Sequence, residues 1–127
     1  MVIDMLALER RQSEAALPQI DHNRFMPLED FLPTVAFVAK SLSDENRLRI
    51  LLCVHEAKKS VSGIVEELNL SQPLVSHHLK ELRRSLLVKV ERRGPFVYYE
   101  IADARIVPIL AALKDLATDL LAARTTF

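Results

Sequence analysis

Two adjacent histidines, His77 and His78, lie in the stretch SQPLVSHHLKELRRS, which covers residues 71–85. Imidazole side chains can bind a metal ion, relay a proton or contact a nucleic acid. A metal site shared by the two is poor geometry, because consecutive residues of a helix do not face each other. The chemistry of this stretch therefore depends on the side of the helix that each histidine occupies.

A helix over residues 71–84 would place the two histidines in different surroundings. At about 100° per residue, with Val75 at zero, Leu79 and Leu82 fall within roughly 40° and form the core side. On the same wheel His77 lies at about 200°, opposite the core, and His78 at about 300°, beside it. We therefore expect His77 to face outward and His78 to be a half-buried residue that hydrogen-bonds locally.

The outward side of this helix is polar and basic. Residues 71–94 contain six lysines and arginines but only two acidic residues, a local net charge of +4, whereas the whole chain has 17 of each and is neutral. For a nucleic-acid binder the distribution of charge matters more than its sum. We expect contacts to double-stranded DNA from Ser71, Gln72, Ser76, His77, Lys80, Arg84, Arg92 and Arg93.

These residue types suit a helix that enters the major groove and a turn that contacts the backbone. Gln72 can bond adenine in bidentate fashion, and Lys80 or Arg84 can meet guanine or phosphate. Ser71 and the helix N-terminus can hold a phosphate. Arginines at a hairpin tip can enter the minor groove or bind phosphate. The alternative for the same residues is a merely solvated helix face and a charged, solubilising turn.

The elements that position these residues should be mostly helices, because a chain with only two glycines in 127 residues has few tight turns. Short β-rich runs, LLVKVER and FVYYEI, flank Arg93-Gly94-Pro95 and predict a two-stranded hairpin. The fold class is mainly α with this small hairpin (α+β). Apolar spacing and capping residues predict helices over 27–42, from an N-cap at Ser43 to Lys58 and Lys59, over 62–68, over 71–84 and from about Asp103 onward.

The first and last of these helices carry apolar residues at alternating spacings of three and four, which is typical of helices that pack lengthwise. The two sets are Leu28, Phe31, Val35, Val38 and Leu42, and Ile106, Ile109, Leu113, Leu116 and Leu120. A small domain has no internal use for two such seams. We therefore infer a homodimer through helices 28–42 and 104–122; the alternative is that one seam packs on the domain's own core.

Three motifs, in this order and spacing, resemble the winged helix-turn-helix of the ArsR/SmtB family of bacterial repressors. They are SDENRLRIL (43–51), LSQPLVSHHLKELRRSLLV (70–88) and ERRGPFVYYEI (91–101). The resemblance implies a dimeric DNA-binding repressor, often released from its operator by a metal ion or another small effector. It adds to the basic helix the expectation of a sequence-specific regulator acting on an inverted-repeat operator.

One residue departs from the family pattern. The family usually has a glycine where this chain has Leu86. Glycine there serves a left-handed helix C-cap. Leucine would cost roughly 1 kcal/mol in that geometry, or the turn must differ.

The chain offers few groups with which to sense an effector. LLCVHE (51–56) resembles the Cys-Val-Cys-Asp stretch of arsenic sensors in the family, with His55 in place of the second cysteine. A soft-metal site needs two or three thiolates, and Cys53 is the only cysteine. The last helix, which zinc sensors of the family use, has no histidine here. Cys53 and His55 are thus weak metal candidates, Cys53 is better explained as a small buried hydrophobe, and no cofactor or effector is assigned.

Several other classes of function are disfavoured. No nucleophile, base and orienting acid group together and no glycine-rich phosphate loop occurs, so an enzyme is not expected. A single cysteine favours the cytoplasm, and no apolar run approaches the roughly 20 residues that span a membrane. We expect an N-terminal arm over 1–26 and one domain over 27–127. The alternative function is a winged-helix protein-interaction module without DNA binding, which would more often have apolar residues at positions 77 and 80.

Overall fold

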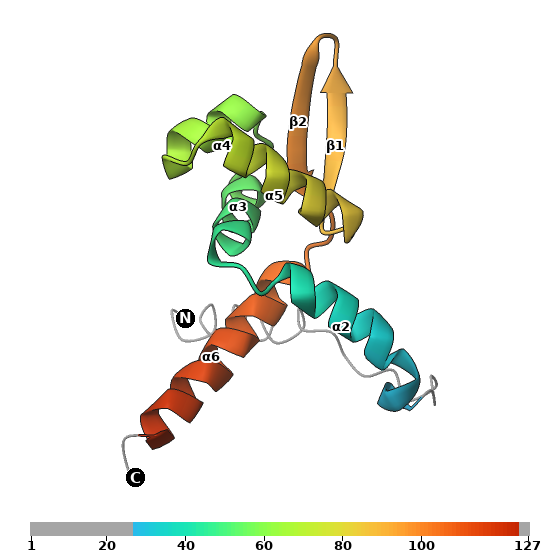
Figure 1. Cartoon of the computed structure of the whole chain (residues 1–127), viewed down its shortest axis with the longest axis vertical. Helices are drawn as coiled ribbons and strands as arrows, with labels where there is room; N and C mark the ends of the chain where they lie inside the picture. The colour runs from blue at the N-terminus through green and yellow to red at the C-terminus, as the bar shows by residue number, and fades with distance from the viewer. Residues whose placement is uncertain (1–26, 125–127) are drawn as a thin grey trace, which may run out of the picture. The chain divides into compact units, whose positions relative to one another are not determined.

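The computed structural model describes residues 27–124, so the arm expected over residues 1–26 lies outside the described part. The described chain is helical apart from one antiparallel hairpin, which confirms the predicted fold class (Figure 1). None of the described helices is long and apolar enough to cross a membrane. The elements are η1 (Leu28–Phe31), α2 (Leu32–Ser41), α3 (Glu45–Glu56), α4 (Val61–Leu68), α5 (Gln72–Arg84), β1 (Val88–Arg93), β2 (Phe96–Ile101) and α6 (Ile106–Arg124).

The described residues belong to two compact units that divide after Asp103, so that α6 is separate from the elements before it. In the first unit, the core lies where α3, α4 and α5 meet. Its fully buried side chains are Ile50, Leu51, Val54, Ile64, Val75, Leu79 and Leu82. Each such side chain contributes about 1.5–3 kcal/mol when it leaves water, so these three helices hold the basic face of α5 in place.

Helix α3 begins and ends at other residues than the pattern predicts. The N-cap is Asp44, whose carboxylate accepts a hydrogen bond from the Arg47 amide at 3.1 Å, and not Ser43. The Ser43 hydroxyl instead donates to the Lys40 carbonyl at 2.6 Å and so completes the end of α2. The helix stops at Glu56 rather than at the two lysines, because the Lys59 backbone pairs with Tyr99 of β2.

Helices α4 and α5 form the expected helix-turn-helix. The Ser60 hydroxyl caps α4 by accepting from the Gly63 amide at 3.1 Å, and Asn69 ends the helix in the left-handed region with φ 53°. The Ser71 hydroxyl caps α5 by accepting from the Leu74 amide at 3.3 Å. The three residues between the two helices are enough to turn the chain, as the sequence predicts.

The junction from α5 to β1 keeps the left-handed geometry although it lacks glycine. Leu86 has φ 64°, its amide donates to the Arg83 carbonyl at 3.1 Å, and the Leu87 amide donates to the Leu82 carbonyl at 2.9 Å. These two bonds define a Schellman motif. The turn therefore does not differ to accommodate leucine, and the strand begins only at Val88 because the two preceding residues complete the cap.

The hairpin, or wing, pairs β1 with β2 from Val88↔Ile101 to Arg93↔Phe96. Its turn contains Gly94 with φ 59°, a conformation that suits glycine. The last helix begins at Ile106 and not near Asp103, and Pro108 falls in its first turn, where its missing amide hydrogen costs little. Only Ile106 of this helix is buried.

Candidate nucleic-acid interface

The two histidines of α5 lie on different sides of the helix, as the helical spacing predicts. His77 is exposed, whereas His78 is only 5% exposed between α5 and α3. The prediction that His78 forms a local hydrogen bond is wrong. Its Nδ1 is buried without a hydrogen-bond partner in the described part of the chain, and its Nε2 lies 3.7 Å from the Asp44 carboxylate. Burial lowers the pKa of His78, and the nearby Asp44 charge opposes this only in part.

The other predicted contact residues all lie at the surface. In α5 they are spread over the exposed side from the Ser71 cap to Arg84, and in the wing both lie at the end of β1, next to the tip. No large exposed apolar side chain occurs among the described residues of α5 itself. The exposed residues of the set are Ser71, Gln72, Ser76, His77, Lys80, Arg84, Arg92 and Arg93.

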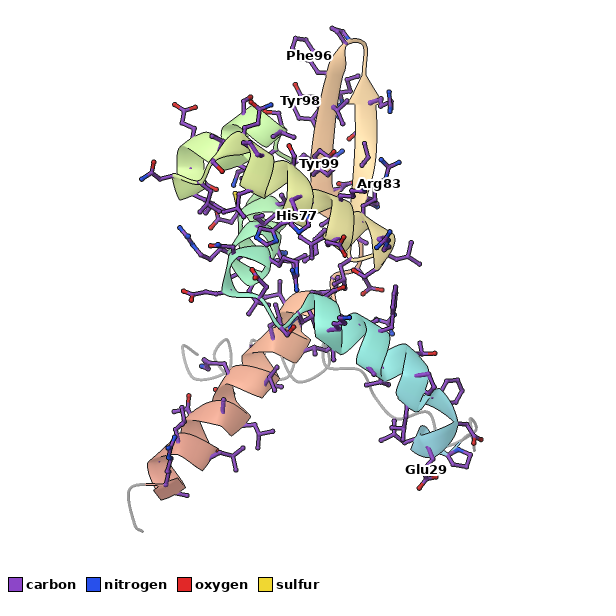
Figure 2. The ribbon with its side chains drawn as sticks, viewed as in Figure 1. Glu29, His77, Arg83, Phe96, Tyr98 and Tyr99 are labelled. Carbon is purple, nitrogen blue, oxygen red and sulfur yellow. The ribbon has the colours of Figure 1, made fainter. Side chains whose placement is uncertain are left out.

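A groove of about 440 Å³ separates α5 from the wing. Its polar lining is Ser76, Lys80, Arg83 and Arg84 from the helix and Tyr99 from β2. Figure 2 labels Arg83 and Tyr99. The sequence pattern did not single out Arg83, which lies near 80° on the wheel between the core and the outward side. Only the position of the wing makes this flank of the helix part of the basic surface.

Not every basic side chain of this surface is free to meet a phosphate. Among the described residues, no carboxylate lies within ion-pair distance of Lys80, Arg83 or Arg92. By contrast, Arg84 lies 3.7 Å from the Glu81 carboxylate, and Arg93 donates to Glu91 at 3.0 Å. Exposed pairs of this kind are weak and exchange readily for other anions. Lys80, Arg83 and Arg92 are therefore the cations of this surface that have no carboxylate to release within residues 27–124 before they bind a phosphate.

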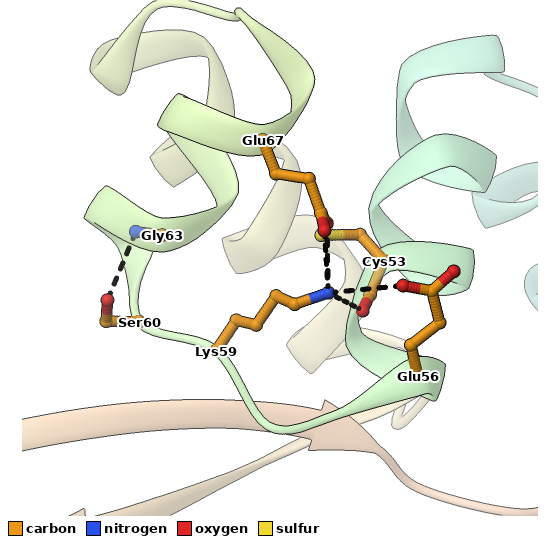
Figure 3. A network of polar contacts seen from close by, with 6 residues as sticks. All are labelled: Cys53, Glu56, Lys59, Ser60, Gly63 and Glu67. Atoms are coloured by element: carbon orange, nitrogen blue, oxygen red, sulfur yellow. Dashed lines mark hydrogen bonds and ion pairs between the residues drawn. The ribbon is translucent and has the colours of Figure 1, made fainter.

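A polar network around Lys59 joins α3 to α4 (Figure 3). The Lys59 ammonium donates to the Cys53 carbonyl at 2.6 Å and to the Glu67 carboxylate at 2.9 Å, and it lies 3.6 Å from Glu56. Because the backbone of the same lysine pairs with Tyr99, one residue joins α3, α4 and β2. The Cys53 thiol also donates a hydrogen bond to Glu67.

This network leaves Cys53 poorly suited to bind a metal. The thiol is 4% exposed, and burial, aided by its hydrogen bond to Glu67, raises its pKa to about 11. The His55 side chain, by contrast, is exposed. Within residues 27–124, no three histidine, cysteine or acidic side chains come close enough to hold a metal ion. The metal hypothesis for Cys53 and His55 thus gains no support from their surroundings.

Comparisons with known proteins identify the family. Residues 44–90 match the model of the family described as "Bacterial regulatory protein, arsR family". A transcriptional regulator of Methanocaldococcus jannaschii, MJ1325, is 34% identical over 82 residues, which are 64% of this chain and 92% of that protein. The repressor SmtB of Mycobacterium tuberculosis is 33% identical over 66% of this chain. The matched region is 62% of SmtB, which is less than two thirds of the length of SmtB.

Solved structures agree with the sequence comparison. The transcriptional regulator HlyU from Vibrio vulnificus has a TM-score of 0.56 and 32% identity, over 68% of this chain and 96% of that one. The homodimeric winged helix-turn-helix DNA-binding domain of Mb0332 from Mycobacterium bovis has a TM-score of 0.64 and 27% identity, over 81% and 91% of the two chains. This chain therefore belongs to the ArsR family of DNA-binding transcriptional regulators, which are not enzymes, and its hairpin is the wing of a winged helix-turn-helix.

Proposed function

We propose that this protein is a sequence-specific repressor that acts as a homodimer on an inverted-repeat operator, with α5 in the major groove and the wing against the adjacent backbone. The observation that carries the proposal is the set of exposed cations on α5 and β1 that have no carboxylate partner among residues 27–124, namely Lys80, Arg83 and Arg92. Support comes from SmtB, which is a repressor, and from Mb0332, whose DNA-binding domain is homodimeric.

The proposed contacts divide into those that recognise the base sequence and those that bind the DNA backbone. Gln72 and His77 have the hydrogen-bonding groups to contact base edges from the first turns of a recognition helix. Lys80, Arg84 and the wing arginines Arg92 and Arg93 supply the charge that phosphates require. Ser71 and Ser76 complete the set as short donors near the helix N-terminus.

The dimer is proposed from two helices, each considered separately. In α2 and the preceding turn no residue is buried, and Leu28 is 70% exposed although it belongs to an apolar seam. In α6, Leu113 and Leu116 are each 53% exposed and Leu120 is 62% exposed. Apolar stripes at this spacing are stable when another helix covers them. Two-fold symmetry would then place two α5 helices on half-sites about 10–10.5 base pairs apart or a multiple of that.

Selection of bound sequences from a random DNA pool, followed by affinity measurements across a range of salt, tests the proposal. We expect an inverted repeat and a strong salt dependence for the selected site. Lys80→Ala should weaken binding to every sequence and lower the salt slope by about 1 per protomer. His77→Ala should instead change the base preference.

The matched control is Lys114→Ala in α6, which removes the same charge from an exposed lysine that pairs with Asp115 at 2.9 Å. This variant should keep the wild-type affinity for DNA and the wild-type dependence of that affinity on salt. Equal binding of selected and random DNA by the wild-type protein at all salt concentrations would refute the proposal.

A further inference from the structure

A second pocket lies on another flank of α5 and shares only Arg84 with the groove that faces the wing. It has a volume of about 320 Å³, and α2, α3 and α5 all contribute to it. Its polar lining consists chiefly of Lys40 and Ser41 from the end of α2, Arg47 from α3, and His77, Glu81 and Arg84 from α5. The DNA contacts expected from the sequence account for only His77 and Arg84 of this set.

The electrostatics of this pocket favour an anion. Three permanent cations, Lys40, Arg47 and Arg84, face a single carboxylate, Glu81, which lies 3.7 Å from Arg84. No carboxylate in the described part of the chain lies within ion-pair distance of Lys40, whose side chain is exposed. The pocket therefore combines the Lys40 ammonium with the Arg84 guanidinium, whose planar geometry suits an oxyanion, and with the positive charge of Arg47.

The end of α2 would normally oppose an anion, because the last carbonyls of a helix carry a partial negative charge. Arg47 removes most of this opposition. Its Nε donates to the Ser41 carbonyl at 2.7 Å, and its Nη2 donates to the Lys40 carbonyl at 3.1 Å. Ser43 donates to the same Lys40 carbonyl at 2.6 Å. With these carbonyls satisfied, the charge that faces the pocket is dominated by the cations.

We propose that this pocket is an oxyanion site for a phosphate-type group, and that a backbone phosphate of the operator occupies it when α5 enters the major groove. The second part rests on the proposed function, because it requires α5 to lie on DNA. Lys40 then becomes a phosphate contact from outside the helix-turn-helix and the wing. A free phosphorylated compound has the same recognition chemistry and would compete with DNA for His77 and Arg84.

The test compares Lys40→Gln with Lys114→Gln, which removes an equal charge from α6. The Lys40 side chain is exposed and has no partner among residues 27–124, so its variant should unfold at the wild-type temperature. On selected DNA, Lys40→Gln should lower the salt slope by about 1 per protomer. Lys40→Arg should restore the slope, and Lys114→Gln should leave it unchanged.

Replacing single operator phosphates by neutral methylphosphonates locates the contact. One position in each half-site should weaken binding of the wild-type protein but not of Lys40→Gln. The backbone-phosphate assignment is overturned if Lys40→Gln keeps the wild-type salt slope and no methylphosphonate position distinguishes it from the wild-type protein. If Lys80→Ala lowers the salt slope in the same experiment, the DNA-binding function stands.

Inorganic phosphate, titrated into the DNA-free protein at constant ionic strength, tests the pocket without DNA. Nuclear magnetic resonance shifts of the His77 ring should change with saturation, and Lys40→Gln should abolish this change. If the wild-type protein binds no selected DNA, the proposed function fails, and a saturable phosphate shift still supports an oxyanion site for a small molecule. Absence of both the shift and the slope effect overturns the proposal.

Discussion

Replacing Leu86 with glycine should stabilise the protein, although it removes an apolar side chain. Leu86 has φ 64°, a left-handed conformation that costs an L-residue roughly 1–2 kcal/mol. Its side chain is 79% exposed, so little buried apolar surface is lost on truncation. Glycine forfeits about 0.5–1 kcal/mol through its greater freedom in the unfolded chain. The free energy of unfolding should therefore be about 0.5–1 kcal/mol higher for glycine than for alanine at this position.

Urea unfolding of Leu86→Gly and Leu86→Ala isolates the backbone contribution, because both variants lose the side chain beyond Cβ and only alanine keeps the Cβ. The control is Glu66, an exposed residue within α4, where glycine should be less stable than alanine by about 1 kcal/mol. All samples need one protein concentration, since dimerisation would contribute to stability. If glycine at position 86 is no more stable than alanine there, the strain assigned to the α5–β1 junction is wrong.

Three further outcomes are expected. Asn69 ends α4 with φ 53°, so Asn69→Ala should lower the free energy of unfolding by roughly 1 kcal/mol and Asn69→Gly should not; urea midpoints distinguish the two. Because the pKa of Cys53 is raised to about 11, its thiol should react with a disulfide reagent at pH 8 roughly a hundredfold more slowly in the folded protein than in urea, and equal rates would contradict its burial. Burial lowers the pKa of His78 below its usual 6.5 in the folded protein. As the pH falls, His78 is therefore protonated in the unfolded chain before it is protonated in the folded protein. The His78 contribution to stability should be complete above pH 6.5 and decline below it, and His78→Gln should show a shallower pH dependence of the urea midpoint between pH 8 and 5.5.

Local sequence signals predicted much of the fold because the interactions involved lie within a few residues of each other. The caps at Ser71 and Asn69, the apolar spacing of α5 and the short turn before it all act over one or two helical turns. The same helical spacing is enough to place His77 and His78 on different sides of α5. The sequence left open whether the turn at Leu86 stays left-handed, and the hydrogen bonds of the Leu86 and Leu87 amides to the last turn of α5 show that it does.

The predictions made from the sequence are wrong or incomplete where segments far apart in the chain contact each other. Asp44 caps α3 because Ser43 is already bonded to the end of α2, and Lys59 leaves the helix because its backbone pairs with β2, forty residues further along the chain. Arg83 joins the basic surface only because the wing lies beside it. Lys40 lines one pocket with His77 and Arg84 only because α2 ends near α5. The sequence by itself thus determined which helices form and which side of α5 is polar; tertiary packing decided which cations gather around that side, since their distance in space does not follow from their distance in the chain.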